Sequence, residues 1–424
     1  MTGRRRRGVR GRRSSALRAG LRSPARLHGG RISQATVFSL VGLGLLAASG
    51  TLTGATPAAH GARVPVIEPA ALTLPASLLV WTPDRLVAGL AGAVAGLPAV
   101  ASTVPVVGAT VWLTGSHDAS GRAVDTFTGG RAVPIDLRAA DLAGYASFVP
   151  AADRATFTGL GAGEVLLGST SARLRRLGPG ATITLDGRTL RVAGVVPDAE
   201  VGTAEVFTAA ATAAQLGVST QRYLLVEPTQ SIGAQQLAAL VRTTSIHPTK
   251  VGVESTGPNL GPDYSVLPQA LEKEYFGEFV ARLPAGNSGW LTLDSAWTSA
   301  HLQTESVPIL GTVTCNAAIL PALRSALTEV VADGLAGSVN PRDYGGCFAA
   351  RLVAGPTTDD ISHHAWGSAI DLNVSANPAG GASHQDPRLV DIFRKWGFTW
   401  GGDWLSPDPM HFELHVPGGT PPTG

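Results

Sequence analysis

The two most informative stretches of the sequence are residues 362–371, Ser-His-His-Ala-Trp-Gly-Ser-Ala-Ile-Asp, and residues 408–413, Asp-Pro-Met-His-Phe-Glu. Both are rich in the imidazole and carboxylate groups that bind metal ions or move protons. His364 precedes Gly367, where a chain can turn back on itself. The first stretch therefore predicts a histidine close to the strand that follows it.

Alternating apolar and polar residues predict a short strand over residues 369–374 and another over 410–414. The first presents Asp371 to one face, and the second presents His411 and Glu413 to the face opposite its apolar side chains. Two such strands can form a site of two histidines and one carboxylate. Three protein ligands with an open fourth position are typical of catalytic zinc, which lowers the pKa of bound water toward about 7.

The pattern Ser-x-His-x-x-Gly-x-Ala-x-Asp with a later Asp/Glu-x-x-His, within residues 290–416, resembles the D-alanyl-D-alanine carboxypeptidase and L-alanyl-D-glutamate endopeptidase family of zinc peptidases. The resemblance implies a Zn²⁺ cofactor, peptidoglycan stem peptides as substrate, and His364, Asp371 and His411 as metal ligands. It also implies an α+β domain of the hedgehog/D,D-peptidase type with a small antiparallel sheet. Trimming of a terminal D-Ala and cleavage within the stem peptide both stay open.

Carried further, the resemblance makes Asp408 the general base, which must lie within hydrogen-bond reach of the metal's open position. Glu413 and Asp403 are alternatives, and Glu413 could instead orient a ligand from behind. Arg351 is the candidate for stabilising the oxyanion, with a surface arginine as the alternative. His363 is expected to point away from the site. Expected in the substrate cleft or behind the ligands, besides Glu413, are Trp366, Trp400, Asp403 and Trp404.

Cys315 and Cys347 are the only cysteines, and both lie in the segment with the catalytic motifs. Outside the cytoplasm they are expected to form a disulfide that stabilises the fold by roughly 3 to 4 kcal/mol. Metal ligation by the two thiols is the alternative. Apolar periodicity predicts helices over residues 321–333 and 387–396.

The charge is divided unevenly along the chain. Residues 1–34 contain 11 Arg and no acidic residue, whereas the remainder carries 22 basic and 31 acidic residues, a net charge of −9. A basic tail without interleaved aromatic residues argues against nucleic acid as a partner. Residues 35–56 are mostly apolar and would span about 33 Å as a helix.

We therefore expect a basic cytoplasmic tail, a transmembrane anchor or signal segment over 35–56, and the rest of the chain outside. The catalytic domain would be extracellular on a single-pass membrane protein, or secreted if the segment is cleaved. A buried core helix after a solvated tail is the alternative.

Short strands and turn dipeptides predict an α+β extracellular domain over residues 60–230, including a hairpin with Asp186-Gly187 at its turn. Residues 163–168 and 180–196 are similar to the extracellular domains of macrolide-export-type ABC permeases, which implies a mixed α+β domain that binds or spaces. Residues 231–289 are expected to form a linker or a docking surface between domains, and 290–424 the zinc peptidase domain.

The expected fold class is thus α+β: a D,D-peptidase-like domain, a mixed α+β domain before it, and one N-terminal membrane segment. The expected function is that of a zinc metallopeptidase that hydrolyses peptidoglycan stem peptides. The alternative is a non-catalytic cell-wall module that binds peptidoglycan or zinc on the same scaffold.

Overall fold

The computed structural model describes residues 77–415, except 231, 247, 249, 258, 263–265, 283–288 and 354–359. The predicted tail 1–34 and the predicted membrane segment 35–56 lie outside these residues. Within the part of the chain that the structure describes, no helix combines the length and the apolar composition needed to cross a bilayer.

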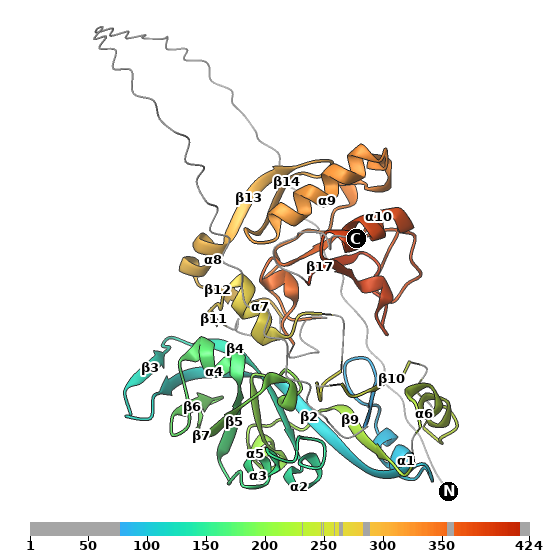
Figure 1. Ribbon diagram of the computed structural model, residues 1–424. Coiled ribbons are helices and arrows are strands. Elements are labelled where there is room, and N and C mark those ends of the chain that lie inside the picture. The colour runs from blue at the N-terminus through green and yellow to red at the C-terminus, as the bar shows by residue number, and fades with distance from the viewer. Residues whose placement is uncertain are drawn as a thin grey trace, which may run out of the picture. The chain divides into compact units, whose positions relative to one another are not determined.

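Six strands close into a barrel in the first half of the described chain (Figure 1). They are β2 (Val100–His117), β4 (Arg131–Ala140), β5 (Glu164–Gly168), β6 (Thr182–Leu185), β7 (Arg188–Val196) and β8 (Val206–Ala209). The pairing runs β2–β6–β7–β5–β8–β4 and returns to β2. All six strands contribute to one buried apolar cluster, which includes Val111, Ile135, Leu167, Ile183, Val192 and Val206.

The predicted fold class was wrong, because it gave this region only as a mixed α+β domain and did not include the closed six-stranded barrel. The parallel pairing of β5 with β7 and the antiparallel pairing of β2 with β4 close the ring. Neither pairing joins consecutive strands, so local alternation could not reveal them. The hairpin at Asp186-Gly187 is confirmed, since the two residues adopt φ values of 46° and 79° between β6 and β7.

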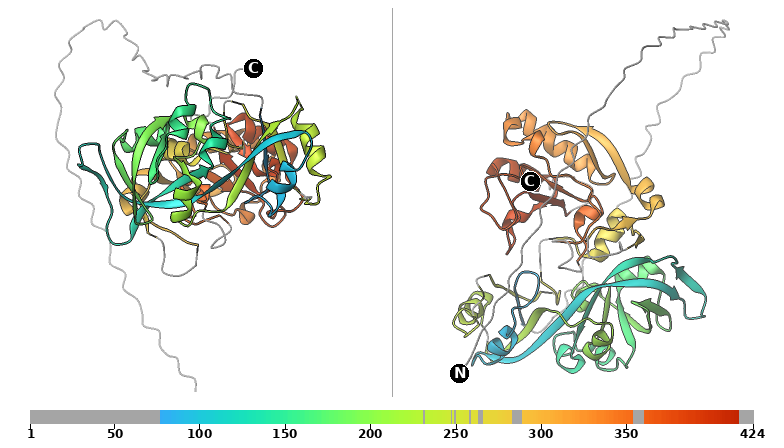
Figure 2. Two further views of the ribbon diagram at one scale, coloured as in Figure 1. Left: turned by 90° about the horizontal axis from the view of Figure 1, so that it is seen from below. Right: turned by 180° about the vertical axis from the view of Figure 1, so that it is seen from behind.

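β2 continues past the barrel to a second group of strands (Figure 2). There it pairs with β9 (Gln221–Pro228), which pairs with β1 (Leu78–Trp81), which in turn pairs with β10 (Gly252–Ser255). The remaining elements of this half are α1 (Leu90–Ala95), β3 (Ala123–Thr126), α2 (Leu142–Tyr145), α3 (Arg154–Thr158), α4 (Ser169–Arg175) and α5 (Ala210–Gln215).

The segment predicted as a linker, 231–289, contains regular elements: α6 (Ala234–Val241), β10, α7 (Gln269–Phe276) and β11 (Ala281–Arg282). β11 pairs with β4 on one side and with β12 (Thr292–Leu293) on the other. Lys273 on α7 donates at 2.8 Å to Glu205, which precedes β8, and both side chains are buried. Two aromatic residues at and after the end of α7, Phe276 and Phe279, join the apolar core of the C-terminal region.

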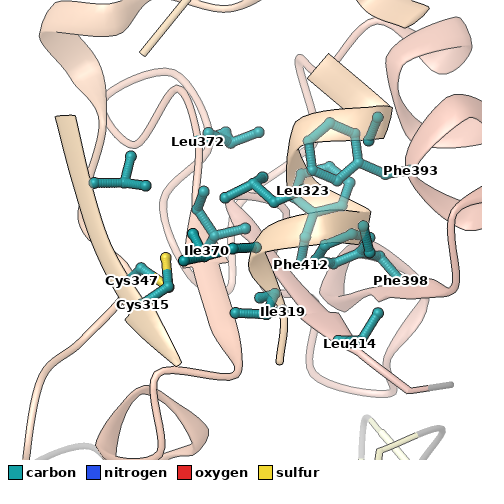
Figure 3. Packing of buried hydrophobic residues seen from close by; sticks show 14 of the residues in the cluster. Cys315, Ile319, Leu323, Cys347, Ile370, Leu372, Phe393, Phe398, Phe412 and Leu414 are labelled. Carbon is teal, nitrogen blue, oxygen red and sulfur yellow. A yellow bond between two sulfur atoms is a disulfide. The ribbon is translucent and has the colours of Figure 1, made fainter. Parts of the chain in front are cut away.

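The C-terminal region has one apolar core, between helices and small antiparallel sheets (Figure 3). Its elements are α8 (Ser295–His301), β13 (Leu302–Val307), β14 (Gly311–Asn316), α9 (Leu320–Ala332), β15 (Ala369–Asp371), α10 (Pro387–Lys395), β16 (Phe398–Trp400) and β17 (His411–Leu414). β17 lies between β15 and β16. Ile370 and Phe412 point from this sheet into the core, so the alternate residues of both strands face the other way.

The two predicted helices of this region are confirmed as α9 and α10. α9 has Pro in its first turn and buries Leu323, Leu327 and Val330 on one face. α10 begins after Asp386, whose side chain accepts the Arg388 backbone N–H and so caps the helix.

Candidate active site

His364, Asp371 and His411 lie together at the sheet of the C-terminal region. His364 is in a short 3₁₀ turn (His363–Ala365), Asp371 ends β15, and His411 begins β17 directly opposite Asp371. His364 Nε2 lies 3.2 Å from His411 Nδ1 and 3.2 Å from Asp371 Oδ2, and His411 Nδ1 lies 3.1 Å from Asp371 Oδ1. Three potential ligand atoms therefore converge on one point.

A glycine turn brings His364 to the strand. Gly367 has a φ of 69°, and a Cβ at this position would come within 2.7 Å of the backbone nitrogen of Asn316. Both the backbone conformation and the close approach require glycine. The turn that the sequence predicted at Gly367 is therefore present, and it sets His364 beside Asp371.

Each histidine has its second ring nitrogen held by an acceptor. His364 Nδ1 lies 2.9 Å from the backbone carbonyl of Cys347, and His411 Nε2 lies 3.0 Å from Glu413 Oε2. Because both partners accept hydrogen bonds, these nitrogens donate, and His364 Nε2 and His411 Nδ1 are the nitrogens that face the cluster. The rings are thus oriented as metal binding requires.

The disulfide between Cys315 and Cys347 fixes the loop that orients His364. Cys315 belongs to β14, and both cysteines are buried in the C-terminal core. The two thiols are consequently not metal ligands. The bond ties the carbonyl that accepts from His364 to a strand of the core.

The electrostatics of the cluster favour a positive charge between the three side chains. Burial alone would raise the pKa of Asp371, but hydrogen bonds and the charges of His364 and His411 outweigh it and hold that pKa well below its usual range. Burial would lower the pKa of His411, yet hydrogen bonds to Asp371 and Glu413 raise it to about 10. Two nitrogens and one carboxylate with this preference fit a zinc ion.

Asp408 is a partly buried carboxylate beside the cluster. Its carbonyl accepts the His411 backbone N–H at 3.0 Å, which places it one tight turn before that residue. Its Oδ1 is buried and has no hydrogen-bond partner among the described residues. Burial and the negative charge of Asp371 raise its pKa, against the charges of His411, His364 and Arg351. An unpaired carboxylate oxygen in this position can accept a proton.

The other two carboxylates considered as the base have different surroundings. Glu413 Oε2 is occupied by His411 and by His363 Nδ1, which lies 2.9 Å away. Asp403 forms an ion pair with Arg394, and its side chain is 55% exposed. Glu413 is therefore hydrogen-bonded to the side of His411 that faces away from the cluster, with only its Oε1 unpaired among the described residues, whereas Asp403 lies at the surface.

The three predicted tryptophans occupy distinct places. The Trp404 ring centroid lies 5.1 Å from that of His411, so Trp404 is next to the cluster. Trp366 is buried and packs on Phe279, with ring centroids 4.8 Å apart. Trp400 donates from Nε1 to the Pro409 carbonyl at 2.9 Å and thereby supports the segment before His411.

The cluster opens into a cavity of about 840 Å³. Arg351 lines it together with Asp408 and Trp404, and its Nη1 donates to the neighbouring Leu352 carbonyl at 3.3 Å. The barrel half of the chain contributes to the same lining through Arg138, Arg222 and Tyr223. Arg222 forms an ion pair with Asp360, which precedes the motif that holds His364.

Two residues that the sequence analysis did not assign to the site belong to its surroundings. His363 was expected to point away, but its Nδ1 lies between Glu413 Oε2 and Glu272 Oε1, at 2.9 and 3.2 Å. Glu272, on α7, is fully buried. No signal in the local sequence distinguishes Glu272 from Glu274, the other acidic residue of α7. Its role depends on a contact with a segment far away in the chain.

Comparison with protein families gives one match in each half of the chain. Residues 355–414 match a family described as D-alanyl-D-alanine carboxypeptidase. Residues 36–244 match the MacB-like periplasmic core domain. Both resemblances noted in the sequence thus have a corresponding family match, and the carboxypeptidase match covers the His364, Asp371, Asp408 and His411 positions.

Two solved structures are similar to part of this chain. The periplasmic region of MacB from Actinobacillus actinomycetemcomitans is 13% identical, with a TM-score of 0.28, over 42% of this chain and 88% of that one. The extracellular domain of the noncanonic ABC-type transporter YknZ from Gram-positive bacteria is 12% identical, with a TM-score of 0.27, over 42% and 98%. No curated protein matches the chain.

Proposed function

We propose that the C-terminal region is a zinc metallopeptidase that hydrolyses amide bonds in peptidoglycan stem peptides. The observation that carries the proposal is the unpaired, buried carboxylate oxygen of Asp408 beside the converging His364, Asp371 and His411. A site that only binds a metal needs the three ligands, whereas hydrolysis also needs a group that accepts a proton. The carboxypeptidase family match supports the choice of substrate class.

His364 Nε2, His411 Nδ1 and a carboxylate oxygen of Asp371 would hold the zinc ion. When bound, zinc would supply Lewis-acid chemistry and make a hydrolytic water available near neutral pH. We assign to Asp408 the acceptance of a proton on Oδ1 and its delivery to the leaving amine. We assign to Arg351 the stabilisation of negative charge on the scissile carbonyl oxygen.

We further propose that this catalysis takes place outside the cytoplasm, on the outer side of the cell membrane or released from it. The disulfide between Cys315 and Cys347 supports an oxidising compartment. The match to a periplasmic core domain supports the same side of the membrane.

The test is to incubate the full chain with two kinds of defined muropeptide. One ends in D-Ala-D-Ala, and the other is shortened so that it offers the L-Ala-D-Glu bond for cleavage. Mass spectrometry then identifies any bond that is cleaved, with and without a chelator and after zinc is restored. We expect one bond to be cut, loss of cleavage with the chelator, and recovery with zinc. Zinc binding without any peptide product would instead favour the non-catalytic binding module.

A further inference from the structure

A chain of buried polar contacts leads from helix α7 to His411. Glu272 Oε1 lies 3.2 Å from His363 Nδ1, His363 Nδ1 lies 2.9 Å from Glu413 Oε2, and Glu413 Oε2 lies 3.0 Å from His411 Nε2. The other oxygen of Glu272 accepts a hydrogen bond from Ser368 at 3.0 Å. The contacts of Glu413 with His363 and His411 are hydrogen bonds, whereas Glu272 Oε1 is at ion-pair distance from His363 without a hydrogen bond.

Helix α7 holds Glu272 in place from two sides. Phe276, one turn later, packs into the C-terminal core, and Lys273 is bonded to Glu205 of the barrel half. Glu272 has no exposed surface, and burial raises its pKa to about 7. A carboxylate buried in this way destabilises a protein unless its partners compensate. An apolar residue would fill the same space at lower cost, which indicates that the carboxylate itself is needed.

The partners of Glu413 explain what Glu272 can contribute. The Oε2 atom of Glu413 accepts from His411 and from His363, whereas its Oε1 has no hydrogen-bond partner among the described residues. The orientation of Glu413 therefore depends on His363. His363 is in turn held between two carboxylates, and it would lose one side of this contact without Glu272.

We propose that Glu272 is a positioning residue of the metal site, which acts through His363 and Glu413 on the ring of His411. The inference rests on the proposed function and deepens it, because it adds to the site a helix that lies outside the carboxypeptidase family match of residues 355–414. Residues behind a metal ligand commonly contribute 10- to 100-fold to metal affinity.

The experiment measures zinc affinity of the full chain by competition with a chelator, and the absorption spectrum of the cobalt-substituted protein. Neither measurement requires turnover, so a failure of the proposed peptidase activity would not affect the outcome. Glu272→Gln removes the charge and keeps the shape, and Glu272→Asp keeps the charge but withdraws it by one methylene. Glu274→Gln is the matched control, since Glu274 is on the same helix and pairs with Arg173 in a more exposed position.

We expect both Glu272 variants to weaken zinc binding by about 10-fold and to change the cobalt spectrum, with Glu274→Gln unchanged. In a double-mutant cycle, Glu272→Gln should add little in a Glu413→Gln background, because both act on His411 by one route. If either Glu272→Gln or Glu272→Asp kept the parental zinc affinity and cobalt spectrum, the positioning role would be overturned. Additive effects in the cycle would overturn the route through Glu413.

Thermal unfolding followed by circular dichroism shows whether each variant is folded. If Glu272→Gln does not fold, Ser368→Ala serves instead, because it removes the hydroxyl that donates to Glu272 and leaves the carboxylate in place. Weaker zinc binding by Ser368→Ala supports the proposal, and parental zinc binding contradicts it.

Discussion

Two buried groups of charged residues, one at the barrel and one at the C-terminal sheet, differ in the partners of their carboxylates. At the barrel, Glu205 is paired with Lys273 and Arg175, which both carry permanent positive charges. At the C-terminal sheet, Asp371 and Glu413 face only histidines, which are cationic only when protonated. In the first group, cations of the protein itself balance the carboxylate charge, whereas the second group favours an additional cation. The buried carboxylate of Glu205 is thus paired with cations of the protein, whereas Asp371 and Glu413 belong to a candidate metal site.

The largest effect is expected from His364→Ala, which removes one of the converging ligand atoms. Bound zinc and peptide hydrolysis should both be lost, since catalytic zinc needs its three protein ligands. Metal analysis after dialysis and the muropeptide assay measure the two losses. If the His364→Ala protein kept one equivalent of zinc, the group at the C-terminal sheet would not differ from the barrel group as the place where a metal ion binds.

Asp408→Asn is expected to keep zinc and to lower kcat by about 10²- to 10⁴-fold, because the amide cannot accept a proton. Zinc content and steady-state kinetics on the same preparation separate the two properties. Asp403→Asn is the matched control, as Asp403 is paired with Arg394 at the surface. Parental turnover in Asp408→Asn would assign the base to another residue.

Lys273→Met is expected to act on stability and to spare the metal site. Removing one cation from the buried group should lower the free energy of unfolding by about 3 to 5 kcal/mol, because Glu205 loses one of its two cations and keeps Arg175, Gln269 and the Asp136 backbone N–H. Urea denaturation measures the loss, and chelator competition should give the parental zinc affinity. A large loss of zinc affinity in a folded Lys273→Met protein would show that the two groups are not separate.

Replacing Cys315 and Cys347 together by Ser should lower stability by about 3 to 4 kcal/mol, as expected for a disulfide that closes a loop of 32 residues. Unlike Lys273→Met, this change should also weaken zinc binding, because the Cys347 carbonyl holds His364. Denaturation and chelator competition test both. An unchanged zinc affinity would mean that the loop keeps its position without the bond.

The smallest effect concerns the pH dependence of stability. Burial would raise the pKa of Glu205, but Lys273 and Arg175 outweigh it and lower that pKa. The stabilisation is therefore complete above the unfolded pKa of about 4.3 and is lost as the pH falls through the lower folded value. The free energy of unfolding should decline in this acidic range, and Glu205→Gln should make the decline shallower.

The sequence predicted those features that depend on neighbouring residues. Strand alternation and Gly367 allowed a site of two histidines and one carboxylate, and the family resemblance pointed to His364, Asp371 and His411. Apolar periodicity was sufficient for α9 and α10. The closure of the barrel was not predictable in this way, because β2 meets β4 and β5 meets β7 across long stretches of chain.

The orientation of His363 shows a second limit of local patterns. An alternation argument places adjacent side chains on opposite sides, but His363 and His364 lie in a 3₁₀ turn, where successive residues are about 120° apart. Both rings can therefore reach the polar interior. Glu272 was missed because a single acidic residue on a short helix carries no mark of its distant partner.

β11 connects the two halves of the chain through its strand pairing. It is hydrogen-bonded to β4 of the barrel and to β12, which leads into the C-terminal region, so one ladder crosses between them. A truncation that starts at residue 290 would discard this strand together with Phe276 and Phe279 of the C-terminal core. The halves are therefore not independent domains that can be exchanged separately. A gene fusion that exchanged one of them would have to include α7 and β11.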